Sequence, residues 1–208
     1  MDYKYIFVVG APGSKWSGVS KNFYYSPDLD NTDYSENRLY AHDASGQTEP
    51  MHSGSYFDPG MEFGNFFDEL DQYTKEECEA EFDRAFTGDG IRTIRSHVFA
   101  HHLDFIRRTW PECPIVLVHR SDDECLGWWV KCGHFNITYP LYHTYYKDLR
   151  TMSKIIENQN ADILTAINTY GGMRPDDNLE LCEIMGIQPP PEQYRQNYSK
   201  INVKVVVI

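Results

Sequence analysis

Residues 3–18 read YKYIFVVGAPGSKWSG, and this stretch decides the fold. An apolar, β-prone run over residues 3–9 precedes a glycine-containing loop and then a helical pattern that begins near Ser17, so the order is strand, loop, helix. A second apolar run, PIVLVH at residues 114–119, has the pattern of a strand buried on both faces of a parallel sheet. Strands and helices alternate along the rest of the chain. We therefore predict a three-layer α/β fold with a central parallel sheet flanked by helices.

The remaining elements are predicted from periodicity, caps and helix breakers. Helices are expected over residues 63–70, 74–86, 101–110, 122–131, 142–170 and 178–185, and strands over residues 91–96 and 201–208. Thr74 is followed three residues later by Glu77, the pattern of a capping box. The long helix has a candidate break at residues 158–160. Residues 26–60 show no periodicity and are expected to form a long irregular excursion, which in a compact domain is usually functional or mobile.

Length and composition indicate one cytoplasmic domain over residues 1–208. With 41% hydrophobic residues the chain can bury a core, yet no window approaches the ~20 apolar residues of a membrane span. The start of the chain is expected to form a strand and not a signal peptide. The five cysteines are scattered and include no C-x-x-C pair, which argues against a disulfide framework and a structural zinc site.

The net charge of −12 disfavours a nucleic-acid partner, because binding phosphates requires a basic surface. The acidic residues concentrate in an acidic, Tyr-rich excursion at about residues 22–90, whose only lysine or arginine residues are Arg38, Lys75 and Arg84. The parts of the chain on either side of it are close to neutral. We therefore expect an anion-binding site to be built from those flanking parts.

The loop after the first strand is the first candidate ligand site. Its candidate residues are Gly13, Ser14, Lys15, Trp16, Ser17 and Gly18. A glycine-containing turn at a helix N-terminus lets backbone N–H groups converge on an anion, and Lys15 adds a positive charge. The ATP-binding pattern G-x-x-x-x-G-K-[ST] is not matched, because Trp16 stands at its lysine position. The loop is either a plain strand-to-helix turn or a phosphate- or sulfate-binding loop, and Lys15 with its two neighbouring serines favours the second.

The second candidate pairs Arg95 with His97 at the end of the strand over residues 91–96. Ligands of open α/β sheets bind outside the carboxyl ends of strands. A histidine there can act as a general base near neutral pH, although a lone histidine is more often structural. His97 and His101 are also spaced like helical metal ligands. No third ligand accompanies them, so we expect no metal.

The third candidate is Arg120, directly after the apolar run 114–119. A planar, permanently charged guanidinium at this edge of the sheet is suited to bidentate phosphate recognition. The alternative is an ion pair with Asp122 or Asp123. In either case Arg120 is expected at the ligand edge of the sheet.

Together these pieces resemble the sulfotransferases that use 3′-phosphoadenosine 5′-phosphosulfate (PAPS). Residues 92–134 carry most of the resemblance, with the step Arg95-Ser96-His97, the apolar run, Arg120 and the pair Trp128-Trp129. Residues 181–194 are similar to the late helix–Gly–Pro segment of the family. The resemblance covers about two-thirds of the chain and implies a P-loop-type fold.

The resemblance also implies roles for the candidate residues. The loop over residues 13–18 would hold the 5′-phosphosulfate, and Arg120 would bind the 3′-phosphate. His97 would deprotonate the acceptor, while Lys15 and Arg95 would stabilise the charge that develops during transfer.

The chain departs from the family pattern at three points. The family loop reads lysine or arginine, serine, glycine, threonine, whereas this chain has Gly13-Ser14-Lys15-Trp16-Ser17. Eight residues after the strand-end arginine the family has a phosphate-binding serine, and this chain has Trp128. The late Arg-Lys-Gly element is replaced at best by Arg174.

These patterns lead to one main hypothesis and two alternatives. The main hypothesis is a sulfotransferase that moves a sulfuryl group from PAPS to a hydroxyl or amine of a small-molecule acceptor. A neutral or cationic acceptor is expected because the acidic excursion repels anions, unless its carboxylates simply form a solvated face. The alternatives are a P-loop kinase of nucleosides or small molecules and a degenerate, non-catalytic relative that binds a partner through residues 26–60.

Overall fold

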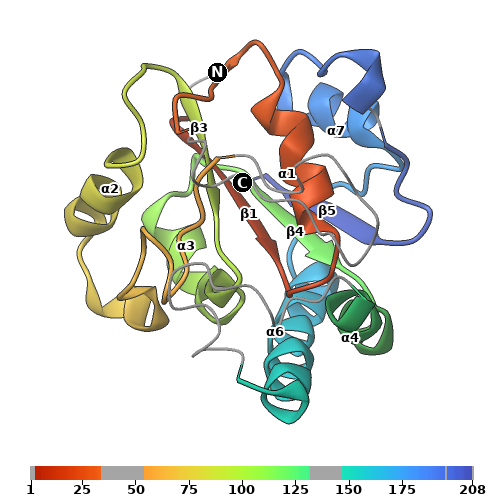
Figure 1. Ribbon diagram of the computed structural model, residues 1–208. Coiled ribbons are helices and arrows are strands. Elements are labelled where there is room, and N and C mark those ends of the chain that lie inside the picture. The colour runs from red at the N-terminus through yellow and green to blue at the C-terminus, as the bar shows by residue number, and fades with distance from the viewer. Residues whose placement is uncertain (1–2, 34–53, 132–146, 195, 208) are drawn as a thin grey trace.

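The computed structural model describes residues 3–33, 54–131, 147–194 and 196–207. Its centre is a five-stranded sheet with the strand order β2-β3-β1-β4-β5 (Figure 1). The strands are β1 (Tyr5–Gly10), β2 (Leu29–Asp30), β3 (Ile91–Arg95), β4 (Ile115–His119) and β5 (Asn202–Val206). All neighbouring pairs are parallel except β4 and β5, which are antiparallel. The predicted α/β class with a central, mostly parallel sheet is confirmed.

Helices cover both faces of this sheet. The α-helices are α1 (Trp16–Tyr24), α2 (Lys75–Asp83), α3 (Leu103–Thr109), α4 (Asp122–Lys131), α6 (Leu149–Thr169) and α7 (Asn178–Met185), and the 3₁₀ helices are η3 (Phe67–Gln72), η4 (Val98–His102) and η6 (Glu192–Tyr194). Helices α2, α3 and α6 pack on one face, whereas α1 and α7 pack on the other. Helix α4 packs against α6.

The central strand β1 explains why both faces are covered. All six of its residues are buried. Because side chains alternate along a strand, Tyr5, Phe7 and Val9 enter the core on the α2 and α6 face, whereas Ile6 and Val8 enter the core on the α1 face. A strand that is apolar at every position needs packed layers on both sides.

The prediction of a central parallel sheet holds for β1, β2, β3 and β4 but not for β5, which is antiparallel to β4. Helix α7 and the segment after it return the chain to the edge of the sheet where β1 and β4 end, so β5 starts at that edge and runs backwards. The strand occupies Asn202–Val206, within the range expected from residues 201–208. This reversal brings residues 199–202 next to the end of β4, where His119 pairs with Asn202.

Several helices differ in detail from the sequence-based expectation. The helix expected over residues 63–70 is the 3₁₀ helix η3, and the helix expected over residues 101–110 is divided into η4 and α3. The capping box of Thr74 and Glu77 is confirmed. Part of the excursion (residues 34–53) and the start of the helix expected over residues 142–170 lie outside the described residues.

The candidate break at residues 158–160 is absent from α6, which runs continuously to Thr169. Gln159 and Asn160 are buried polar side chains inside this helix. Asn160 is tolerated there because its amide group bonds to the turn after β4. Asn160 thus connects α6 to the turn after β4 and does not end the helix.

Two general properties of the chain can also be read from the described ranges. Within them, no helix is long and apolar enough to cross a membrane. Cys78, Cys113, Cys125 and Cys182 are buried free thiols, and Cys132 lies outside these ranges.

Candidate functional site

The fold opens a crevice between the carboxyl ends of β1 and β4. After β1 the chain passes to the α1 face of the sheet, whereas after β4 it passes through α4 to α6, which lies on the opposite face. Two neighbouring parallel strands whose connections leave to opposite faces form a switch point, the usual ligand position in open α/β sheets. The two loops at this point are residues 11–15 and residues 120–121.

The loop after β1 has an unusual backbone at two positions. Gly13 has φ +82°, and a Cβ atom there would lie 2.2 Å from the carbonyl oxygen of Cys125 in α4. Lys15 has φ +68° and caps α1 without a side-chain hydrogen bond. A non-glycine residue in the left-handed region costs free energy and often marks a functional position. The backbone of Lys15 is therefore strained, and its side chain is directed to the crevice.

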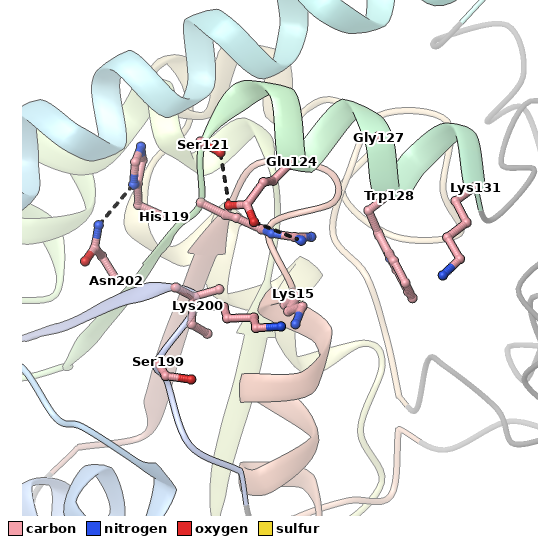
Figure 2. A pocket seen from close by; sticks show the side chains of 12 residues that line it. Lys15, His119, Ser121, Glu124, Gly127, Trp128, Lys131, Ser199, Lys200 and Asn202 are labelled. Carbon is pink, nitrogen blue, oxygen red and sulfur yellow. Dashed lines mark hydrogen bonds and ion pairs between the residues drawn. The ribbon is translucent and has the colours of Figure 1, made fainter.

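A cavity of about 890 Å³ occupies the crevice. Figure 2 shows that side chains from three parts of the chain surround the same space: Lys15 from the loop, Glu124 and Trp128 from α4, and Lys200 from the segment before β5. The full lining is Lys15, His119, Arg120, Ser121, Glu124, Gly127, Trp128, Lys131, Ser199, Lys200, Ile201 and Asn202. Four of these residues are lysine or arginine and one is glutamate, so the cavity carries a net positive charge.

The cations of the cavity repel one another. Burial lowers the pKa of Lys15, and the positive charges of Arg120 and Lys200 lower it further, against the opposing effect of Glu124. Glu124 partly compensates through an ion pair of 3.6 Å between its Oε1 and the Nη2 of Arg120. A bound anion would neutralise the same charges more completely. The electrostatics of the lining thus favour an anionic ligand.

Hydrogen bonds hold both the side chain and the backbone of Arg120. Its Nη1 donates to the carbonyl oxygen of Gly13 at 3.2 Å, which joins the two loops of the crevice. Its own carbonyl oxygen accepts from Nδ2 of Asn160 at 2.8 Å, and the same amide donates to Oδ1 of Asp122 at 2.6 Å. Nε of Arg120 is buried and has no hydrogen-bond partner among the described residues. The two terminal nitrogens of the guanidinium make their contacts at the edge of the cavity, Nη1 with Gly13 and Nη2 with Glu124.

No family model, curated protein or solved structure matches this chain. The site must therefore be judged from its own geometry.

Of the predicted ligand-binding residues, Lys15 and Arg120 line the cavity together. The other loop residues do not line it. Ser14 is fully buried, and its Oγ has no hydrogen-bond partner among the described groups. Ser17 Oγ shares a hydrogen bond of 3.2 Å with the hydroxyl of Tyr56, and Gly18 lies against the side chain of Gln196.

His97 lies beside the loop but does not line the cavity. Its Nδ1 is 2.5 Å from the carbonyl oxygen of Gly10, so this nitrogen must carry the proton and donate it. The ring packs on Trp16, with 4.1 Å between ring centroids. Burial lowers the pKa of His97, partly offset by the negative charge of Asp58 and by the bond to Gly10. The ring is therefore neutral at neutral pH, with an unprotonated Nε2.

Arg95 also lies outside the cavity lining. Only 2% of the residue is exposed. Its Nε donates to the carbonyl oxygen of Ser55 at 3.2 Å, and its guanidinium lies 4.8 Å from the ring centroid of Tyr56. Arg95 thus binds the end of the excursion to β3 on the same side as His97. The structure does not bring it together with Lys15 and Arg120.

Sequence reasoning missed the contributions of His119, Lys131 and the segment after α7. Burial lowers the pKa of His119, whose Nδ1 lies 3.4 Å from Nδ2 of Asn202. Ser199 and Lys200 line the cavity from the segment just before β5, whereas Arg174 does not line it. The one available signal was Lys200, just before the last strand. It indicates a place in the site only once β5 is known to run antiparallel to β4, because that direction puts the start of β5 beside the end of β4.

Proposed function

We propose that the chain is a sulfotransferase of P-loop type that takes PAPS as its donor. The observation that carries this proposal is the positively charged cavity at the switch point between β1 and β4, with Lys15 and Arg120 on its two loops. The strand order with β1 in the centre and a loop-to-helix turn after it supports the P-loop assignment. PAPS, when bound, supplies an activated sulfuryl group.

The backbone conformation of Lys15 supports the proposal, although the sequence differs from the sulfotransferase pattern at this position. Lys15 stands where the family pattern has glycine, and it adopts the left-handed conformation that glycine adopts readily. The conformation of Lys15 is therefore one that a glycine at this position would adopt without strain, which supports the proposed alignment of the loop. In this arrangement Lys15 adds an ammonium group to the loop. Lys15 and Arg120 would stabilise negative charge on the donor's phosphate oxygens.

His97 has the protonation state that a general base needs. Because its Nδ1 proton is donated to Gly10, Nε2 carries a lone pair. Burial keeps the ring neutral at neutral pH. In the proposed reaction Nε2 would take the proton of the acceptor hydroxyl or amine as the acceptor bonds to the sulfur. The bond between the sulfur and the bridging phosphate oxygen would break at the same time and release 3′-phosphoadenosine 5′-phosphate. Arg95 would contribute by holding Tyr56 next to this ring.

The acceptor remains expected to be neutral or cationic. Some carboxylates of the acidic excursion are neutralised within the fold: Asp83 pairs with Lys4 and Arg92, and Glu81 pairs with Arg84. The field of the excursion is therefore weaker than its composition implies. An acceptor screen at several salt concentrations tests this point, because polyanionic acceptors that react best, at rates that fall with added salt, would contradict it.

The choice of donor can be tested by thermal unfolding with candidate ligands. A ligand at 100 times its dissociation constant adds ~2.7 kcal/mol to the free energy of unfolding. We expect stabilisation by 3′-phosphoadenosine 5′-phosphate without magnesium. The variant Arg120→Ala should lose this stabilisation, whereas Arg174→Ala, which removes an exposed arginine outside the cavity, should retain it.

The two alternative functions predict different results in the same experiment. A small-molecule kinase would be stabilised by Mg-ATP alone, and the position of Trp16 at the kinase lysine argues against it. A non-catalytic relative would show no stabilisation by any nucleotide and would instead form a stable complex with a partner through residues 26–60. Lack of any nucleotide-dependent stabilisation would overturn the proposed function.

A further inference from the structure

Residues 55–58, near the end of the irregular segment 26–60, are attached to the end of β3. The backbone N–H of Phe57 donates to the carbonyl oxygen of Arg95 at 2.8 Å, and the side chain of Arg95 donates back to the carbonyl oxygen of Ser55. These two bonds fix residues 55–58 along the residues that lead into His97. Tyr56 and Asp58 therefore lie next to His97, the proposed general base.

Asp58 is an acidic residue in the interior of the protein, with 2% of its surface exposed. Its Oδ1 accepts three hydrogen bonds: from Oγ of Ser96 at 2.8 Å, from the backbone N–H of His97 at 2.7 Å and from that of Val98 at 3.3 Å. Its Oδ2 is buried and receives no hydrogen bond from the described residues. A buried carboxylate with a free oxygen is costly unless a positive charge compensates it.

Among the described residues, Asp58 is the one charged group whose field acts on the His97 ring. The ring is in contact with the carbonyl oxygen of Gly10 and the ring of Trp16, and Tyr56 lies 6.5 Å away between ring centroids. All three are uncharged. Asp58 acts on the ring electrostatically and favours its protonated form. When Nε2 takes a proton, the buried imidazolium and the half-satisfied carboxylate compensate each other.

We propose that Asp58 is the positioning residue of His97, holding its backbone through Oδ1 and supplying the counter-charge for its protonated ring. The proton comes from the acceptor hydroxyl or amine, whose bonding electrons stay on the acceptor, and it is held on Nε2 of His97. This inference rests on the proposed role of His97 as general base. It adds a residue that neither the sequence patterns nor the resemblance indicated.

The variant Asp58→Asn removes the charge and keeps the shape. In the full-length chain, the titration of the His97 ring can be followed by nuclear magnetic resonance, with His97→Gln to assign its signal. We expect the midpoint to fall by about 1 pH unit or more, because a nearby opposite charge typically shifts a pKa by that amount. The acidic limb of the kcat profile should move in the same direction, with an unchanged KM for the donor.

Two matched variants separate charge from structure. Ser96→Ala removes one hydrogen bond to Oδ1 but leaves the carboxylate, so the His97 midpoint should remain near the wild-type value. Asp28→Asn removes a carboxylate that bonds to Gln188, and it should also leave the midpoint unchanged. If Asp58→Asn fails to fold, the ¹³Cγ signal of Asp58 in the wild-type chain should shift with the titration of His97.

The outcomes are distinguishable. A His97 midpoint that is unchanged in folded Asp58→Asn, or a ¹³Cγ signal that ignores the titration of His97, would overturn the inference. A shifted midpoint in Asp58→Asn together with unshifted midpoints in the two control variants supports it. Because the titration needs no turnover, a shifted midpoint in a chain without sulfuryl transfer would support the coupling of Asp58 to His97 and reject the proposed function.

Discussion

Replacing Lys15 by glycine should stabilise the fold and weaken the site at the same time. The backbone of Lys15 has φ +68°, which costs a side-chain-bearing residue ~1–2 kcal/mol. Glycine loses more conformational entropy on folding than other residues do, which lowers the free energy of unfolding by roughly 0.5–1 kcal/mol. Lys15→Gly should therefore exceed Lys15→Ala in free energy of unfolding by about 0.5–1 kcal/mol, because both lack the ammonium group and only alanine keeps the strained Cβ.

The assay for this prediction is thermal or urea unfolding of both variants, with and without 3′-phosphoadenosine 5′-phosphate. For a chain of this length the difference corresponds to a melting temperature higher by about 1–4 °C in the glycine variant. Both variants should bind the ligand about ten-fold or more weaker than wild type, because a hydrogen bond to a charged group contributes ~1.5–3 kcal/mol. An alanine variant as stable as the glycine variant, or unchanged ligand affinity in both, would refute this reasoning.

Three further predictions concern the same cavity. Glu124→Gln should raise the affinity for the nucleotide by up to about five-fold in calorimetry, because the carboxylate competes for Arg120 and exposed pairs contribute ~0.2–1 kcal/mol; a lower affinity would contradict it. Asn160→Ala should lower the free energy of unfolding by about 1–3 kcal/mol and weaken nucleotide binding, because the turn at Arg120 loses its donor, whereas Asn158→Ala on the exposed side of α6 should change neither. Nucleotide affinity should fall as pH rises through the lowered pKa of Lys15, since a bound anion favours its charged form, and Lys15→Arg should abolish this dependence when calorimetry is repeated across alkaline pH.

The fold was largely predictable because its signals are local. The apolar run of β1, the loop after it and the run 114–119 each specify a buried strand or a turn without reference to the rest of the chain. The same is true of the capping box at Thr74. The direction of β5 was not predictable, because it depends on how the chain returns after α7 and not on the residues of the strand.

The candidate site was predictable only in part, since a cavity is made by residues far apart in the sequence. Lys15 and Arg120 could be proposed because each directly follows a recognisable strand. Lys200 and Lys131 give no such signal, and only the folded chain brings them to the same cavity. The position of Arg95 was not predictable either, because its guanidinium bonds to the carbonyl oxygen of Ser55, far away in the sequence, and does not line the cavity.

The most direct measurement is transfer of ³⁵S-labelled sulfuryl from PAPS to a panel of neutral and cationic hydroxyl and amine acceptors. The proposed function predicts labelled acceptor with the wild-type chain, without added metal. It also predicts loss of label with His97→Gln, while that variant still binds 3′-phosphoadenosine 5′-phosphate in calorimetry. Label transfer at the wild-type rate by His97→Gln would contradict the assignment of the base. A wild-type chain that neither binds the nucleotide nor transfers label would contradict the proposed function itself.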